Sequence, residues 1–281
     1  MITFADVTKK IELLPALSNV TLEIQALYQD GYENVNIFKL VKLIESDATL
    51  TANVLKVLNS PKYGFAKKIT SISQAVTLLG TKMIYAIVIS NAINERLMAN
   101  VSAYGVTNIQ FNDMCHLQSA LVMQWYSLID IRDAQFLTSL ALIMESGKLI
   151  LAKEIAQSSY ISTFRRGLAQ TKDIAEYEYE MFETTSYYIS GLLFEHWNLD
   201  ETFIEVLKGL DFEFEEPNPK IQMYRDILDV IRKAINVKEI LTKESIQNAS
   251  DAVEKIGLST DSFLKIANRV KRSYEESKGI V

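Results

Sequence analysis

The sequence predicts an all-α protein, and three observations support that class. The chain has 10 glycine and 4 proline residues among 281. In average proteins glycine makes up about 7% and proline about 5% of the residues, so turn-forming residues are sparse here. Apolar residues recur at steps of three and four along most of the chain, which is the spacing of one helix face. Alternation of apolar and polar residues, the mark of a half-buried strand, never extends beyond a few residues.

Three helices are expected in the first 60 residues. The first is amphipathic and stops at Asp30-Gly31, and its apolar face consists of Leu13, Leu14, Leu17, Val20, Ile24 and Leu27. Asn36 is a typical N-cap residue for the second helix. The third has its apolar positions between Leu50 and Leu58.

Gly80 divides the next helical segment. Ser71 and Gln74 fit a capping box at the start of a short helix, and Gly80 closes that helix because glycine tolerates a left-handed conformation. A long apolar helix follows over about 81–97. This pair could be a helix-turn-helix, but the stretch Met83–Ile89 offers no Arg, Asn or Gln to base edges, so burial explains it better.

The second half of the chain also reads as helical. Residues 98–112 lack clean periodicity and are interpreted as a connector between two helical layers. Four helical patterns follow, over about 113–129, 134–157, 174–197 and 200–210. The acidic, proline-containing segment 211–219 is the clearest linker, and two or three more helices are expected in 220–281.

Composition and charge exclude several classes of protein. The formal charge of −6 does not supply the phosphate attraction on which nucleic-acid binders depend. The apolar run Met83–Ile89 is far shorter than the roughly 20 residues of a membrane span. The lone Cys115 cannot form an internal disulfide, and no secretory leader follows Met1, so we expect a cytoplasmic protein.

Candidate catalytic residues are scarce. The two histidines, His116 and His196, do not form a zinc-binding spacing such as HExxH, and no glycine-rich phosphate loop is present. Cys115 stands next to His116, but neighbouring helix residues point about 100° apart. A cysteine in this position is more often a small buried apolar residue than a nucleophile.

A basic turn follows the helix that ends near Asn59. Pro61 prevents that helix from continuing, and we expect Tyr63 to pack inward. The lysines of the turn, together with Lys56, could contact an acidic partner or a phosphate, or could form an ordinary solvated turn. The candidate interaction turn consists of Asn59, Lys62, Tyr63, Lys67 and Lys68.

Several short segments occur in a distinctive order and spacing over 14–80. They are Leu14-Pro-Ala-Leu17, Leu43-Ile-Glu-Ser-Asp47, Leu50-Thr-Ala52, Leu55-Lys-Val-Leu-Asn-Ser60, Tyr63-Gly64, Ile69-Thr-Ser-Ile72 and Ala75-Val-Thr-Leu-Leu-Gly80. In this order they resemble the HDOD family, whose name stands for HD-related output domain. The resemblance continues more weakly through Ala141–Leu149 and Gly191–Leu199.

HD enzymes, to which this family is related, hold metals with His and Asp side chains. The resemblance implies that Met144-Glu145 stands at the position of their His-Asp pair, and that Tyr187 stands at the position of a further histidine. A thioether is a poor ligand for hard cations, so at most His116 and Glu145 remain from the ligand set. We expect the relic HD-site positions His116, Met144, Glu145 and Tyr187 to have become core, with no catalytic residue, no metal and no cofactor.

The resemblance also implies an organisation for the chain. We expect an HDOD domain over 8–210, with an N-terminal helical part at 8–98 packed against a degenerate HD-like part at 113–210. The linker 211–219 would lead to C-terminal helices in 220–281 that pack on the same body.

The resemblance implies a non-enzymatic bacterial signal-transduction regulator that acts through protein–protein interactions with other signalling proteins. It favours neither a membrane nor a nucleic acid as partner. One alternative is a degenerate HD-type metal-dependent phosphohydrolase with residual metal or nucleotide binding. Another makes the turn between Lys56 and Lys68 a docking point for RNA or an acidic protein.

Overall fold

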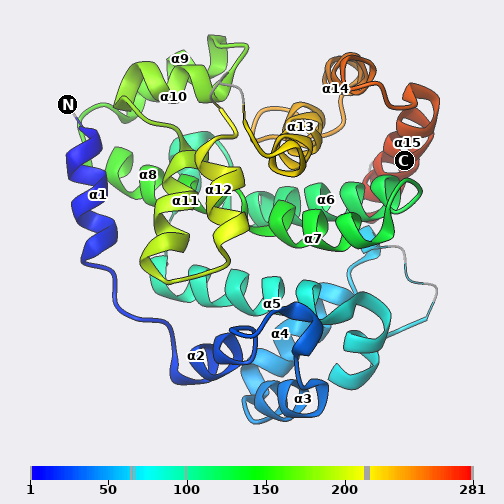
Figure 1. Ribbon diagram of the computed structural model, residues 1–281. Helices are drawn as coiled ribbons and strands as arrows, with labels where there is room; N and C mark the ends of the chain where they lie inside the picture. Colours follow the sequence, from blue (N-terminus) through cyan, green and yellow to red (C-terminus); the bar gives the residue numbers. More distant parts are fainter. Residues whose placement is uncertain (1, 64, 66, 99, 212–215, 280–281) are drawn as a thin grey trace. The chain divides into compact units, whose positions relative to one another are not determined.

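The computed structural model describes residues 2–63, 65, 67–98, 100–211 and 216–279, which Figure 1 traces. These residues are mainly helical, and the only extended pairing among them is an isolated bridge between Ile235 and Ile240. The predicted all-α class is therefore confirmed. The chain divides into two compact units, and each unit is assembled from three separate segments.

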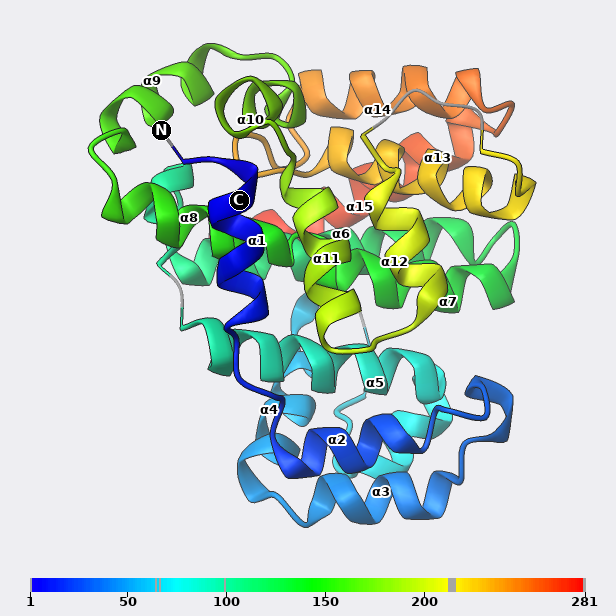
Figure 2. The ribbon, with the colours of Figure 1, turned by 60° about the vertical axis from the view of Figure 1, so that its left-hand side comes forward.

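The first unit consists of Met1–Ala16, Arg96–Cys115 and Met144–Thr260. Within it, α11 packs against α8 and α12, and α13 packs against α14, as the views in Figures 1 and 2 show. Its helices are α1 (Phe4–Glu12), η3 (Val101–Tyr104), α8 (Ser146–Gln157), α9 (Ile161–Gln170), α10 (Ile174–Phe182), α11 (Ser186–His196), α12 (Glu201–Lys208), α13 (Pro219–Ala234) and α14 (Lys243–Lys255).

The second unit consists of Leu17–Glu95, His116–Ile143 and Asp261–Val281. Its helices are α2 (Asn19–Ala26), η1 (Tyr32–Asn34), α3 (Ile37–Glu45), α4 (Ala48–Leu58), η2 (Pro61–Tyr63), α5 (Ile72–Leu97), α7 (Ile131–Ile143) and α15 (Thr260–Lys278). The helix α6 (Asn108–Tyr126) begins in the first unit and continues in the second. Its buried Trp125 packs edge-on against Phe263 of α15, with ring centroids 5.0 Å apart.

These units draw on all three parts of the chain that the sequence distinguishes. The division into 8–98, 113–210 and 220–281 therefore stays a prediction about domain boundaries. Of the expected linker 211–219, residues 212–215 lie outside the described residues.

The first expected helix is wrong in its bounds. Residues 13–18 lie between helices: α1 ends before them at Glu12, and only α2, which begins at Asn19, falls within the expected helix. Pro15 lies in that gap, where its missing N–H does not interrupt a helical ladder. Ser18 then starts α2, because its hydroxyl accepts a hydrogen bond from the backbone N–H of Thr21.

Two long helical patterns are also divided in the structure. The pattern 134–157 becomes α7 and α8, with Met144 and Glu145 between them, and the pattern 174–197 becomes α10 and α11. At the second break Glu183 adopts a left-handed conformation, with φ of 57°, and the Thr185 hydroxyl caps α11. The helix α9 was not predicted. Both breaks border the candidate site.

The break at Gly80 is confirmed. Gly80 has φ of 77° and ψ of 167°, a conformation that side chains rarely adopt, and it separates the two helical segments that are counted together as α5. The predicted capping box is confirmed in part: the Ser71 hydroxyl accepts a hydrogen bond from the Gln74 N–H, but the Gln74 side chain accepts from the N–H of Thr70 and not from that of Ser71.

Two helical stretches, Ile72–Leu97 and Ile131–Gln157, are long and apolar enough to cross a membrane by length and composition. Most residues of their apolar windows are buried within the protein. This burial is the pattern of core helices. The second stretch is also not one helix, because it contains the break between α7 and α8.

Candidate functional site

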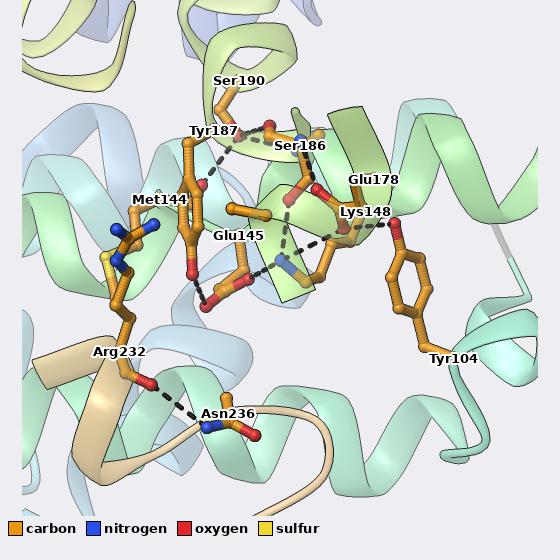
Figure 3. A network of polar contacts seen from close by, with 12 residues as sticks. Tyr104, Met144, Glu145, Lys148, Glu178, Ser186, Tyr187, Ser190, Arg232 and Asn236 are labelled. Atoms are coloured by element: carbon orange, nitrogen blue, oxygen red, sulfur yellow. Dashed lines mark hydrogen bonds and ion pairs between the residues drawn. The ribbon is translucent and has the colours of Figure 1, made fainter. Parts of the chain in front are cut away.

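Three of the four relic positions lie in the first unit. Met144 and Glu145 form the turn between α7 and α8, and Tyr187 lies in the first turn of α11. Figure 3 shows these residues together with the network of polar contacts that surrounds Glu145 and Tyr187. His116 belongs to the second unit.

A buried ion pair occupies the centre of the network. Lys148 Nζ lies 2.8 Å from Glu145 Oε2, and the two side chains are 2% and 1% exposed. The same ammonium group lies 3.6 Å from Glu178 Oε1 and donates a 2.7 Å hydrogen bond to the Ser186 hydroxyl. Lys148 thus supplies positive charge to two carboxylates that have no access to solvent.

Glu178, on α10, is held by further donors. The Tyr104 hydroxyl of η3 donates to Glu178 Oε1 at 2.7 Å, and the backbone N–H of Ser186 donates to Glu178 Oε2 at 2.6 Å. These bonds link η3, α10 and α11 around one carboxylate. The buried carboxylate therefore has both ionic and neutral partners.

Tyr187 is the second hydrogen-bonding partner of the Glu145 carboxylate. Its hydroxyl donates a 2.9 Å hydrogen bond to Glu145 Oε1, and the Lys148 ammonium lies 4.5 Å from the centre of its ring. The guanidinium of Arg232, from α13, lies 5.3 Å from the same ring. Arg232 in turn pairs with Asp211 and with Asp229, whose Oδ1 accepts from Arg232 Nε at 2.8 Å.

Burial and charge shift the pKa values in this network. Burial alone lowers the pKa of Lys148, but the carboxylates of Glu145 and Glu178 outweigh it and raise that pKa above its usual value. Burial raises the pKa of Glu178, although Lys148 opposes the shift. Burial also raises the pKa values of Tyr104 and Tyr187 well above their usual range. Lys148 is therefore a cation, and both phenols are neutral donors, at neutral pH.

Close backbone contact brings the turn against α11. A side chain at Gly147 would place its Cβ 1.9 Å from the Ser186 carbonyl oxygen, so only glycine fits there. The Gly147 N–H donates to the Ser190 hydroxyl at 2.7 Å, and that hydroxyl donates to the Met144 carbonyl. The sequence Ser146-Gly147-Lys148 thus positions the lysine next to Glu178 and Ser186.

The donors present do not fit a divalent metal. Met144 is fully buried and offers a thioether, while the oxygens of Glu145 already contact Lys148 and Tyr187. Within the part of the chain that the structure describes, no group of three or more His, Cys, Asp or Glu residues is arranged to hold a metal ion.

His116 lies with the candidate interaction turn. The Tyr63 hydroxyl is 3.3 Å from His116 Nδ1 and 3.5 Å from the Ser119 hydroxyl. Tyr63 is 3% exposed, so its expected inward packing is confirmed. The structure therefore brings together one relic position and one turn residue that the sequence treated separately.

Asn59 supports the turn from within. Its side-chain amide donates to the carbonyls of Leu55 and Ile69 at 2.8 Å, and its oxygen accepts from the Ile69 N–H at 2.8 Å. These bonds close α4 and fix the return of the chain. Of the remaining turn residues, Lys62 is half-buried and Lys67 and Lys68 are exposed.

The other two candidate residues, His196 and Cys115, contribute to the packing of the protein. His196 Nε2 lies 3.2 Å from the Leu14 carbonyl oxygen at the end of α11. Cys115 is buried, and burial, reinforced by Glu145, raises its pKa well above the usual value. A thiol with a raised pKa is a poor nucleophile.

Sequence reasoning missed most of the network. The sequence patterns do not single out Lys148, Glu178, Tyr104 or Arg232. One signal was available, because Glu145 and Lys148 are opposite charges three positions apart within an otherwise largely apolar run. Charged residues within such a run are rarely buried unless they are paired, so this spacing favours a buried ion pair.

The chain matches known proteins in sequence and in fold. The model of the HDOD domain matches residues 14–209. An uncharacterized protein of Treponema pallidum (strain Nichols) is 32% identical over 78 residues, a segment that covers 28% of this chain and 15% of that protein. The match therefore spans only a small part of that relative.

Solved structures share the fold at low sequence identity. A candidate signal transduction protein of Marinobacter aquaeolei VT8 is 17% identical with a TM-score of 0.71, over 98% of this chain and 60% of that chain. A candidate phosphohydrolase of Shewanella amazonensis SB2B is 15% identical with a TM-score of 0.69, over 95% and 94% of the two chains. At these identities the likeness concerns the fold.

Proposed function

The chain belongs to the HDOD domain family, and on that premise we propose that it is a non-enzymatic bacterial regulator of signal transduction. It acts in the cytoplasm by binding other signalling proteins. The observation that carries the proposal is the position of Lys148 between Glu145 and Glu178. A lysine there supplies internally the charge that a catalytic metal would supply to acidic ligands.

The internal completeness of the network supports this reading. Glu145 is contacted by Lys148 and Tyr187, and Glu178 by Lys148, Tyr104 and the backbone of Ser186. A hydrolytic metal requires ligands that are free to bind it and an open position for water. Carboxylates that are already paired within the protein favour a structural role for this site. We therefore place the function on the protein surface.

The proposed contact surface for a partner protein includes the exposed Lys67 and Lys68. Asn59 and Tyr63 are held inside the unit, while Lys67 and Lys68 are exposed. An acidic patch on a partner would complement them, and such contacts weaken as salt screens them. The same lysines would serve an RNA backbone if the partner were a nucleic acid.

The test is purification of the tagged chain from its own cells after brief crosslinking, followed by identification of bound proteins. The Lys67→Ala/Lys68→Ala variant should lose a specific partner that wild type retains. The matched control is Lys9→Ala/Lys10→Ala, which removes the same charge from exposed positions of α1. If wild type and both variants captured the partner equally, the turn would not be the contact surface. Recovery of RNA in place of protein would favour the nucleic-acid alternative.

The alternative function is that of a degenerate phosphohydrolase with residual metal or nucleotide binding. It rests on the fold likeness to the Shewanella protein. A calorimetric titration with manganese separates the two functions, because residual binding at Glu145 would give a saturable signal that Glu145→Ala abolishes.

A further inference from the structure

A cleft of about 310 Å³ lies in the first unit, next to the buried network. Its lining comes from the start of α10 and the turn before it, from α11, from α13 and the turn after it, and from α14. Tyr187 and Arg232 contribute to both the cleft and the network. The volume is sufficient for a small organic molecule.

Some basic residues of the cleft form ion pairs with acidic residues, and others do not. Arg232 is fixed by Asp211 and Asp229, and Lys233 pairs with Asp229. Lys172 and Lys255 are exposed and make no ion pair or hydrogen bond with the described residues. Two unpaired ammonium groups and one oriented guanidinium therefore line the same cleft.

The acidic residues of the cleft already have partners. Asp229 pairs with Arg232 and Lys233, and these cations outweigh burial and lower its pKa. Each of the other acids accepts a hydrogen bond from a neutral group: Asp173 from backbone N–H groups, Glu239 from the Thr242 hydroxyl and Asp251 from the Gln247 amide. Carboxylates keep capacity for further hydrogen bonds, which hydroxyl groups of a ligand can donate.

We propose that the cleft binds a small polyhydroxylated organic anion. Its phosphate or carboxylate group would pair with Lys172 and Lys255, with the oriented Arg232 as a third donor. Its hydroxyl groups would bond to the acidic side chains and to Asn248, whose amide makes no hydrogen bond with the described residues. This binding goes beyond the proposed protein–protein function and does not depend on it.

The experiment is isothermal titration calorimetry on the purified full chain at near-physiological salt. The probes are ribose 5-phosphate, which carries a phosphate and hydroxyl groups, gluconate, which carries a carboxylate and hydroxyl groups, and uncharged ribose. The test variant is Lys172→Ala/Lys255→Ala. The matched control is Lys153→Ala/Lys243→Ala, which removes two exposed lysines of the same unit that do not line the cleft.

The proposal expects saturable one-to-one binding of at least one charged probe and none of ribose. Affinity should fall about tenfold or more in Lys172→Ala/Lys255→Ala and remain within about twofold in the control. The identity of the probe that binds distinguishes a phosphate site from a carboxylate site. Absence of saturable binding, or equal weakening in both variants, would overturn the proposal without bearing on partner capture, which involves no added ligand.

Discussion

Lys148 Nζ lies 2.8 Å from Glu145 Oε2, and both side chains are buried where the chain passes from α7 to α8. This pair, extended by Glu178 and Tyr187, links the α7–α8 turn to α10 and α11. Isolated buried charges are expensive, so each member depends on the others. The network is therefore a structural centre of the first unit.

Replacing Lys148 with methionine should be strongly destabilising. The variant keeps a long side chain but leaves Glu145 and Glu178 buried without a cation, and breaking a buried pair in this way costs about 3–5 kcal/mol. Urea unfolding followed by circular dichroism measures the loss. The control is Lys153→Met, an exposed position on the same helix. A loss no greater than the control's would show that the ion pair does not support the fold.

Gly147→Ala should also destabilise the protein. The new Cβ would lie 1.9 Å from the Ser186 carbonyl oxygen, and backbone atoms on both sides would have to move apart. Overpacking of this kind costs about 1–3 kcal/mol or more. The thermal midpoint should fall clearly, while Ser146→Ala at the preceding position should have a smaller effect. An unchanged midpoint for Gly147→Ala would contradict the close approach of α8 and α11.

The all-α class and the Gly80 break could be predicted because helix spacing and glycine conformation are local properties. The division at Met144 and Glu145 could not, since neither residue is a helix breaker and the turn is stabilised by Ser190, far along the chain. The candidate site could likewise be predicted only in part. The resemblance placed Met144 and Glu145, but the partnership of Lys148 with Glu178 depends on packing between distant helices.

Tyr63 should be important for the stability of the second unit. It is buried and its hydroxyl contacts His116, so Tyr63→Ala should lower the free energy of unfolding by about 3–5 kcal/mol, as for other large aromatic truncations. Tyr63→Phe keeps the ring and should cost only about 1 kcal/mol for the lost hydrogen bond. Chemical unfolding of the two variants compares these values. Equal effects of both changes would indicate that the ring contributes little.

Stability should fall as pH rises above about 10. Burial raises the pKa values of Tyr104 and Tyr187, so the folded chain keeps phenolic protons that the unfolded chain releases near about pH 10. Lys148 acts in the same direction, because its carboxylate neighbours outweigh burial and raise its folded pKa. Its contribution is present below about pH 10.4 and is lost as pH rises further.

Urea unfolding at a series of pH values from neutral to alkaline measures this dependence. Tyr104→Phe/Tyr187→Phe should show a shallower decline above about pH 10 than wild type, because two of the linked protons are gone. The variant with Tyr160→Phe, at an exposed position, serves as the control. A wild-type stability that stays level through this range would contradict the assignment of these groups.

The central claim is that Lys148 and Tyr187 satisfy the acidic groups that a catalytic metal would require. Elemental analysis of the purified protein, after incubation with manganese or magnesium and removal of excess ion, tests it most directly. The expected result is far less than one metal per chain and no phosphoester hydrolysis in the same samples. One bound metal per chain that Glu145→Ala removes, or hydrolysis that His116→Ala abolishes, would contradict the claim and favour the enzyme.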